Sequence, residues 1–230
     1  MQLEAKTLEV LKNFSDINQS LIVKKGNVLR TIRHGKSLTA SAVIPQSFER
    51  DFAVYDLKKF INVISLFKNP KADIEFQDSR MIIRAGKQKI SYGYCDPDNI
   101  EDHPPSEQLL IDKVLSKGEV AMFTLPAETI SQSIKVAATL SNPQIAFVGK
   151  EGKLMLESLN VDMSLFDNYS VEIGETPFAF KAVFEIVNLN YLALNDYNIR
   201  VLNCGAAVFE GNDYQYVMMM NSKHPTFSKT

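Results

Sequence analysis

Residues 145–159, IAFVGKEGKLMLESL, decide the fold, because they repeat an arrangement that the chain has already used once. Apolar residues on both sides of Gly152 predict two strands joined by a tight turn. Residues 21–33, LIVKKGNVLRTIR, have the same layout around Gly26. The sequence therefore predicts two similar hairpins. If the segments on either side of them also match, the chain contains a larger repeat.

The segments around the two hairpins follow the same order in both halves of the chain. An amphipathic helix is predicted before each hairpin, further strands after it, then a second helix and three short strands. Turn positions repeat as well, since Gly152 follows Gly26 by 126 positions and Gly211 follows Gly86 by 125. The helices are expected over residues 5–18 and 56–67 in the first half, and from Pro126 to 140 and, with a weaker pattern, over 184–194 in the second.

The segment between the halves has the composition of a linker. Residues 95–108, CDPDNIEDHPPSEQ, hold three prolines and five acidic residues among few apolar ones. Such a segment favours a connection over a packed element. We therefore expect two similar α+β domains, over residues 1–100 and 109–230, joined by a linker of residues 101–108, each with two helices packed on antiparallel sheet.

Composition bounds the function without naming it. Apolar residues make up 45% of the 230, which is enough for a packed core, and the net charge is −2. A protein that grips DNA over its whole surface is usually basic, whereas one that touches DNA through a single face need not be. Cys95 and Cys204 are expected to be free thiols in a reducing compartment. We expect neither a signal peptide nor a membrane span.

The predicted helix over residues 56–67, DLKKFINVISLF, raises the question of what its lysines face. Asp56 is expected to cap the helix, and Leu57, Phe60 and Ile64 to form its apolar stripe. Lys58 and Lys59 then point away from the sheet. Taken alone, they are most simply solvated lysines on an amphipathic helix, because an exposed helix face is ordinarily charged.

Three segments resemble one known family, in the same order and at similar spacing. They are VLKNFSDIN (10–18), VYDLKKFINVISL (54–66) and GAAVFEGNDYQYV (205–217). The chain resembles the DNA polymerase sliding clamps, or processivity factors, of the T-even-like bacteriophages. The resemblance extends over nearly the whole chain, and its weight comes from several weak matches being collinear.

This resemblance implies a fold, an activity and partners. The clamp fold assembles as a head-to-tail homotrimer, a closed ring whose helices line the hole and whose sheets form the outer wall. Double-stranded DNA passes through the hole without being read by sequence, and the ring holds the replicative DNA polymerase. An ATP-driven clamp loader opens and closes it. The implied setting is the cytoplasm of the infected bacterial host, where RNA polymerase-associated late transcription factors are further partners.

Site residues follow from the resemblance and from the helix faces. A sliding ring needs sparse, mobile positive charge that attracts phosphate without reading bases, and lysine supplies it. Basic residues of the family match Lys12 and Lys135. Ala138 and Leu192 stand where further basic residues are expected, so the second domain is expected to contribute less. The residues expected to face DNA are Lys12, Lys58, Lys59, Lys135 and, off-centre, Lys6.

A groove for partner peptides and a ring contact are also implied. The family's groove lies near the linker and the C-terminal end, where apolar or adaptable residues are expected to line it. Alternation along the last strand means that at least one of Met218–Met220 is core. Ring closure is expected at the strands around 80–84 or at 178–182, unless these are internal. The groove candidates are Met220, Phe227, Pro225 and Ile100.

No enzyme signature is present in the sequence. His34, His103 and His224 have no nucleophile at a meaningful position, and GKEGK at 149–153 lacks the spacing of a phosphate loop. Asp96 and Asp98 are expected to be solvated and not to bind a metal. We therefore expect no cofactor and no catalysis. Two other classes stay open: a non-catalytic nucleic-acid-binding module and a viral structural ring protein.

Overall fold

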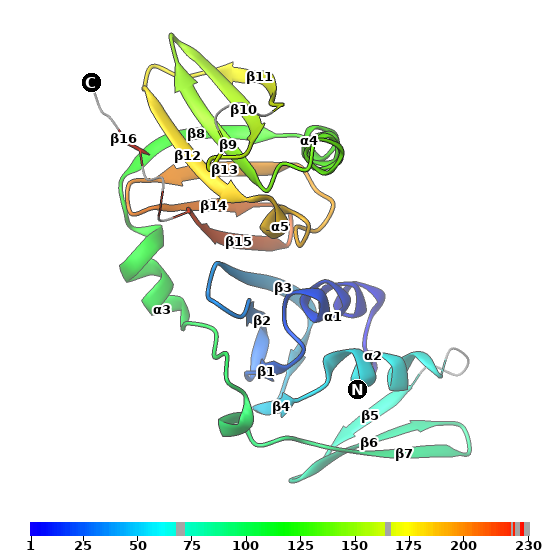
Figure 1. Cartoon of the computed structure of the whole chain (residues 1–230). Coiled ribbons are helices and arrows are strands. Elements are labelled where there is room, and N and C mark those ends of the chain that lie inside the picture. Colours follow the sequence, from blue (N-terminus) through cyan, green and yellow to red (C-terminus); the bar gives the residue numbers. More distant parts are fainter. Residues whose placement is uncertain (68–71, 164–166, 222, 224–225, 228–230) are drawn as a thin grey trace. The chain divides into compact units, whose positions relative to one another are not determined.

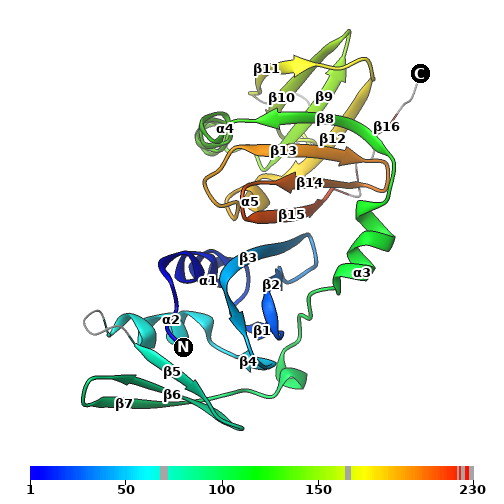
Figure 2. The same ribbon diagram turned by 180° about the vertical axis from the view of Figure 1, so that it is seen from behind.

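The computed structural model describes residues 1–67, 72–163, 167–221, 223 and 226–227, and places them in two compact units. Unit 1 comprises residues 1–34 and 40–104, and unit 2 comprises residues 35–39 and 105–230. Figure 1 and Figure 2 show each unit as helices set against antiparallel strands. None of the helices described is long and apolar enough to cross a membrane.

Unit 1 contains the first copy of the repeat. Its two helices lie side by side against the strands (Figure 1). Strand β1 pairs with β4, β2 with β3, and β5, β6 and β7 form a sheet in that order. The elements are α1 (Ala5–Ile17), β1 (Leu21–Val23), β2 (Gly26–Ile32), β3 (Leu38–Phe48), β4 (Phe52–Val54), α2 (Leu57–Ser65), β5 (Asp73–Phe76), β6 (Arg80–Ala85) and β7 (Gln88–Gly93).

Both helices of unit 1 form where their apolar residues recur at helical spacing. Helix α1 buries Val10, Leu11 and Phe14, and α2 buries its own stripe of Leu57, Phe60, Ile61 and Ile64. Burial of one such large side chain contributes about 1.5–3 kcal/mol. The amphipathic pattern therefore fixes which face of each helix meets the sheet and which face stays in solvent.

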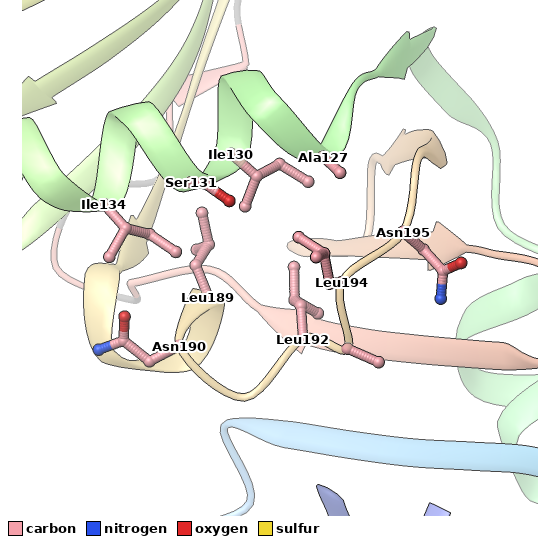
Figure 3. Close-up of a pocket in the computed structure, with 10 residues that line it drawn as sticks. Ala127, Ile130, Ser131, Ile134, Leu189, Asn190, Leu192, Leu194 and Asn195 are labelled. Carbon is pink, nitrogen blue, oxygen red and sulfur yellow. The ribbon is translucent and has the colours of Figure 1, made fainter. Parts of the chain in front are cut away.

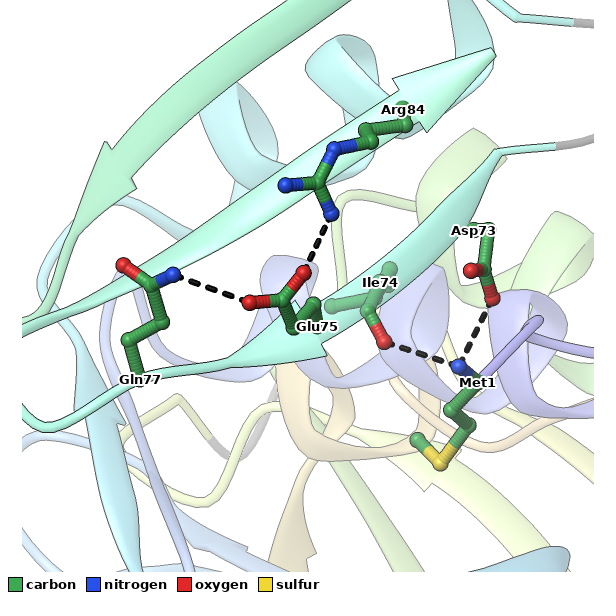
Figure 4. A network of polar contacts seen from close by, with 6 residues as sticks. All are labelled: Met1, Asp73, Ile74, Glu75, Gln77 and Arg84. Atoms are coloured by element: carbon green, nitrogen blue, oxygen red, sulfur yellow. Dashed lines mark hydrogen bonds and ion pairs between the residues drawn. The ribbon is translucent and has the colours of Figure 1, made fainter. Parts of the chain in front are cut away.

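The outer strand β5 is anchored at the first residue of the chain. The Met1 nitrogen donates to Asp73 Oδ1 at 2.7 Å and to the Ile74 carbonyl at 2.8 Å, while Ile74 N donates to the Met1 carbonyl at 2.7 Å (Figure 4). Next along the strand, the Arg84 guanidinium bonds Glu75 and holds the pKa of that carboxyl below its usual range. Residues 1–3 thus run beside β5 without belonging to a regular strand.

Unit 2 contains the second copy, with one strand more before its first helix. The strands β15, β14, β13 and β8 are neighbours in one antiparallel sheet, and β11, β10, β9, β12 and β16 in another. The elements are α3 (Glu107–Leu110), η2 (Ile111–Leu115), β8 (Glu119–Leu125), α4 (Ala127–Thr139), β9 (Gln144–Lys150), β10 (Lys153–Leu159), β11 (Tyr169–Glu175), β12 (Phe180–Glu185), α5 (Ile186–Leu189), β13 (Tyr197–Leu202), β14 (Ala206–Glu210), β15 (Tyr214–Met219) and β16 (Thr226–Phe227).

Aromatic side chains fill the core of unit 2. Phe147 of β9 lies within 6.3 Å, centroid to centroid, of the rings of Phe123, Phe184 and Phe209. Tyr197 OH donates to the Ala193 carbonyl at 2.6 Å, so the buried hydroxyl has its partner. Burial raises the pKa of Tyr197 to about 12. These rings connect the two sheets of the unit into one core.

The predicted duplication and fold class are confirmed. The order helix, four strands, helix, three strands recurs in both units, with turns at Gly86 and Gly152 and at Gly211, as the spacing predicts. The hairpin predicted around Gly26 is wrong, because Gly26 is the first residue of β2, and β1 pairs with β4 whereas β2 pairs with β3. The helix expected over residues 184–194 is much shorter than predicted. Only Ile186–Leu189 is helical, and the residues after it form a loop. The predicted limits of the domains and the linker stay predictions.

Removal of the Asp56 cap tests the start of α2. Asp56 Oδ1 accepts the Lys59 N–H at 2.8 Å, so Asp56→Ala leaves this donor without a protein acceptor. We expect a loss of about 1 kcal/mol in the free energy of unfolding. Thermal unfolding followed by circular dichroism should show a Tm lower by about 2–4 °C. Asp56→Asn keeps the acceptor and should change the Tm little. Equal Tm values for all three proteins would contradict the capping role.

Candidate nucleic-acid interface

The lysines predicted to face DNA lie on the solvent faces of the helices, away from the buried stripes. Lys12 of α1 and both Lys58 and Lys59 of α2 are exposed. Lys6 is half-buried at the start of α1 and lies 3.2 Å from the Glu9 carboxylate. Because α1 and α2 pack side by side, unit 1 gathers these cations on one helical surface.

The charges on this helical surface differ in their partners. Lys58 Nζ lies 2.9 Å from Asp16 Oδ1, which belongs to the last turn of α1. Within the described ranges, no ion pair is found for Lys12 or Lys59. The surface therefore holds two lysines available to an external anion and one that an internal carboxylate already engages.

The corresponding surface of unit 2 is less basic. Lys135 is exposed on α4, and Ala138 follows it on the same exposed side. The other helix, α5, ends at Leu189, before the expected basic position at Leu192 is reached. Only Lys135 of the predicted residues thus lies on the helices of this unit.

An apolar cavity lies between α4 and the loop that follows α5. It measures about 150 Å³, and Figure 3 shows Ile130 and Ile134 of α4 opposite Leu189, Leu192 and Leu194. Leu194 is 79% exposed although it borders this cavity. The loop after α5 thus places leucine side chains at positions where a longer, amphipathic α5 would place charged ones. The apolar residues of 184–194 therefore do not follow a clear helical period.

Of the residues predicted to line a partner groove, Ile100 belongs to unit 1 and Met220 to unit 2. Ile100 is 4% exposed and packs against Ile22, Ala53 and Cys95 within unit 1. An extended linker was expected to leave Ile100 available, but its side chain belongs to a core cluster, so we remove it from the groove. Met220 is half-buried and its N–H donates to the Gly205 carbonyl at 2.9 Å.

The C-terminal candidates are only partly described. Phe227 pairs in β16 with Phe180 of β12, and Pro225 lies outside the described residues. Of the three consecutive methionines, Met218 is fully buried whereas Met219 is 39% exposed. Alternation along β15 decides this difference, as the strand period of two requires.

A short helical segment covers one face of unit 2 and was not foreseen. Residues 107–115 form α3 and the π-helical η2, with Ser106 Oγ accepting the Leu109 N–H at 3.2 Å as a cap. Leu110 packs against apolar residues of β13, β14 and β15. One of these residues, Ala206 of β14, is the strand partner of Met219 in β15. The strand residues are Leu202, Ala206, Val208 and Val217. The sequence signal was available in Ser106 followed by Leu109–Leu110, but the acidic linker composition masked it.

The strands expected to close a ring are internal. Strand β6 lies between β5 and β7, and β12 lies between β9 and β16. The alternative, that these segments are simply internal, is the correct one, because a strand with apolar residues on both faces is buried in the middle of a sheet. The end strands are instead β5 and β7 in the three-stranded sheet of unit 1, and β11 and β16 in the five-stranded sheet of unit 2.

The described residues contain no cluster of three or more His, Cys, Asp or Glu side chains suited to a metal. His34 Nδ1 lies 3.2 Å from Asp102 Oδ2, and this histidine is largely exposed. His103 is exposed, and His224 lies outside the described residues. Cys95 and Cys204 are free thiols.

Comparisons of the sequence with known proteins find similarity to proteins of DNA replication. The family model described as DNA polymerase processivity factor matches residues 3–100. A sliding clamp of Vibrio phage KVP40 is 28% identical over 94% of this chain and 97% of its own length. The sliding clamp of Enterobacteria phage T4 is 26% identical over 96% of this chain and 97% of its own length.

Similarity to solved structures extends the fold beyond phages. A Helicobacter pylori beta clamp bound to a DNA ligase peptide has a TM-score of 0.69 at 17% identity, over 96% of this chain. The chain spans only 65% of that bacterial protein. PCNA of Thermococcus kodakaraensis has a TM-score of 0.64 at 12% identity, covering 94% of this chain and 96% of its own. At these identities the likeness shows the fold alone.

Proposed function

We propose that this chain, a member of the sliding clamps of T4-like bacteriophages, encircles duplex DNA as a closed ring and tethers the replicative DNA polymerase to its template. The chain is a processivity factor and not an enzyme. The observation that carries the proposed DNA contact is the placement of exposed lysines on the helices of both units, opposite to their buried stripes.

The chemistry of this surface suits a ring that moves along DNA. Lysine is a mobile point charge, and contact with phosphate carries no sequence information. Each phosphate contact adds to the attraction and makes it sensitive to salt through counterion release. A dense basic lining would hold the ring in place, so a sparse one serves sliding better. Enclosure then keeps the ring on DNA, and a net charge of −2 is no obstacle.

Ring closure is proposed at the sheet edges β7 and β11. An unpaired edge is a template for another strand, and a head-to-tail contact closes a ring when the rotation per subunit is right. The β7 edge and its turn carry Lys87 and Lys89, whereas β11 carries Glu172 and Glu175, all exposed. Glu172 also lies 2.8 Å from Lys153 Nζ of the neighbouring strand, so Glu175 is the carboxylate of this edge for which the described residues show no ion pair. These opposite charges support pairing of β7 in one copy with β11 in the next, and three copies of two units make the homotrimer.

Partners are proposed to dock on the outer side of unit 2. The apolar cluster under residues 107–115 ends at Met219, an adaptable side chain that suits varied peptides. Met220 follows it, and the predicted contacts of Phe227 and Pro225 with partner peptides stay part of the proposal. The polymerase and RNA polymerase-associated late transcription factors would share this surface.

A clamp loader completes the proposal, because a closed ring cannot enter DNA that has no ends. Opening the ring needs energy from ATP, and the described residues offer no phosphate loop for it, so the loader supplies that chemistry. These partners meet in the cytoplasm of the infected bacterial host.

Retention on circular DNA tests the proposed function. A ring loaded onto a nicked circle by its cognate loader should stay bound in high salt, and should leave once the circle is linearised. Gel filtration should separate loaded from free clamp, and native mass should be near three times 25.9 kDa. Equal loss from circle and linear DNA would indicate a simple binding module. Failure to stimulate the polymerase, with a stable ring, would indicate a structural ring protein.

A further inference from the structure

We propose that Asp16 is an internal competitor of DNA phosphate for Lys58, and that it weakens the contact of the clamp with DNA so that the ring slides. This inference rests on the proposed function and assigns a role to a residue of the same surface. The carboxylate would act by occupying the ammonium group until a phosphate displaces it.

The geometry holds the two side chains together. Lys58 Nζ lies 2.9 Å from Asp16 Oδ1, and the two side chains are 63% and 64% exposed. The end of α1 and the start of α2 are linked by the backbone, since Leu57 N donates to the Gln19 carbonyl at 2.8 Å. A phosphate approaching from solvent therefore meets both charges at once.

Neither charge is placed to stabilise its own helix. Asp16 lies in the last turn of α1, where the macrodipole disfavours an anion, and α1 has no basic residue in that turn. Lys58 lies in the first turn of α2, where the macrodipole disfavours a cation, and no acidic residue occupies that turn. An exposed ion pair also contributes little to folding. Stability therefore does not explain why these two charges lie here.

The start of α2 is instead suited to attract an anion. The positive end of its dipole favours phosphate, and Lys58 and Lys59 add two positive charges, while the Asp56 carboxylate already accepts the Lys59 N–H. Asp16 offsets part of this attraction at Lys58, whereas Lys59 has no ion pair within the described residues. Lys59 can thus bind phosphate directly, whereas Lys58 must first break its ion pair with Asp16.

Replacement of Asp16 by asparagine tests the competition. Asp16→Asn should bind a short blunt-ended DNA duplex about two- to five-fold more tightly, which is the range an exposed ion pair can supply. The slope of log affinity against log salt should steepen by about 0.9 for each copy in the ring whose Lys58 gains a phosphate contact. Fluorescence anisotropy over a series of salt concentrations measures both. Single-molecule tracking of the loaded ring should show slower diffusion.

A matched control removes the same charge elsewhere in unit 1. Asp51 lies 2.9 Å from Lys24 Nζ, in an equally exposed ion pair away from α1 and α2. The hydrogen bonds from Lys24 and from the Lys25 N–H lower the pKa of Asp51. Asp51→Asn should leave the salt slope and the diffusion rate unchanged.

A double-mutant cycle decides whether Asp16 acts through Lys58. In a Lys58→Ala background, Asp16→Asn should have no further effect on the slope. The inference is overturned if Asp16→Asn behaves like Asp51→Asn, or if its effect persists without Lys58. If the native ring stays on circular DNA while Asp16→Asn changes nothing, only this inference fails. If neither protein binds the duplex or stays on the circle, the proposed function fails with it.

Discussion

Replacement of Lys12, Lys58, Lys59 and Lys135 by alanine should abolish most of the processive synthesis that the proposed clamp supports, while the proposed ring stays assembled. All four side chains lie on helix faces opposite to the core, so their removal leaves packing intact. Each lost phosphate contact lowers the slope of log affinity against log salt by about 0.9. If the proposed trimer forms, the losses from its three copies combine, and the product length at moderate salt should fall more than tenfold. Primer extension on a long circular template, read on a denaturing gel, measures the product length.

The control variant removes the same number of positive charges, four lysines, from positions outside the predicted DNA-facing helices. The exposed lysines outside α1, α2 and α4 include three in turns and loops and one at the end of β9; they are Lys24, Lys25, Lys117 and Lys150. Their replacement by alanine should leave processivity within about two-fold, because long-range effects of exposed charges are screened. Native mass should equal that of the unmodified protein in both variants. Unchanged synthesis by the first variant at moderate salt would remove the helical surface from the DNA contact.

Substitution of Gly149 by alanine should destabilise unit 2 more than other glycine substitutions in strands. A Cβ at Gly149 would overlap the Phe178 carbonyl oxygen and would lie 2.8 Å from the Phe180 ring. The carbonyl belongs to the backbone beside β9, so the strand pair β9–β12 must shift to make room. Overpacking of this kind costs about 1–3 kcal/mol. Differential scanning calorimetry should record a Tm lower by about 2–10 °C.

Gly93→Ala provides the comparison for this prediction. A Cβ at Gly93 meets no heavy atom within 4 Å, and the residue also lies in a strand, β7. Its Tm should stay within about 1–2 °C of the unmodified protein, since the free energy cost of a surface substitution is small. Equal Tm values for the two variants would show that β9 adapts to the methyl group, contrary to the close approach described here.

Local patterns predicted much of the fold. The stripe of Leu57, Phe60 and Ile64, with Asp56 as its cap, needs only residues within a few positions of each other. Repetition of the order of elements then indicated the duplicated α+β architecture, and collinear resemblance indicated the clamp family. The exposure of Lys12, Lys58 and Lys59 followed from the same periodicity. These features are readable because each is set by neighbours in sequence.

Features that depend on distant residues could not be read in this way. The linker composition around Ile100 indicated exposure, but Ile22 and Ala53 bury its side chain. Strand β6 has the same apolar pattern whether it lies at an edge or between β5 and β7. The proximity of Asp16 to Lys58 arises only when two helices pack, since 42 positions separate the residues in the chain.

The amino-acid sequence by itself determined the order of the repeated elements, the inward and outward faces of the main helices, and the resemblance to the phage sliding clamps. Tertiary structure alone decided which strands end a sheet, that residues 107–115 cover the strands of unit 2, and which lysine an acid engages. The physical reason is one of range. Periodicity and capping act over a few residues, whereas strand neighbours, burial and ion pairs between elements depend on which distant segments the packed core brings together.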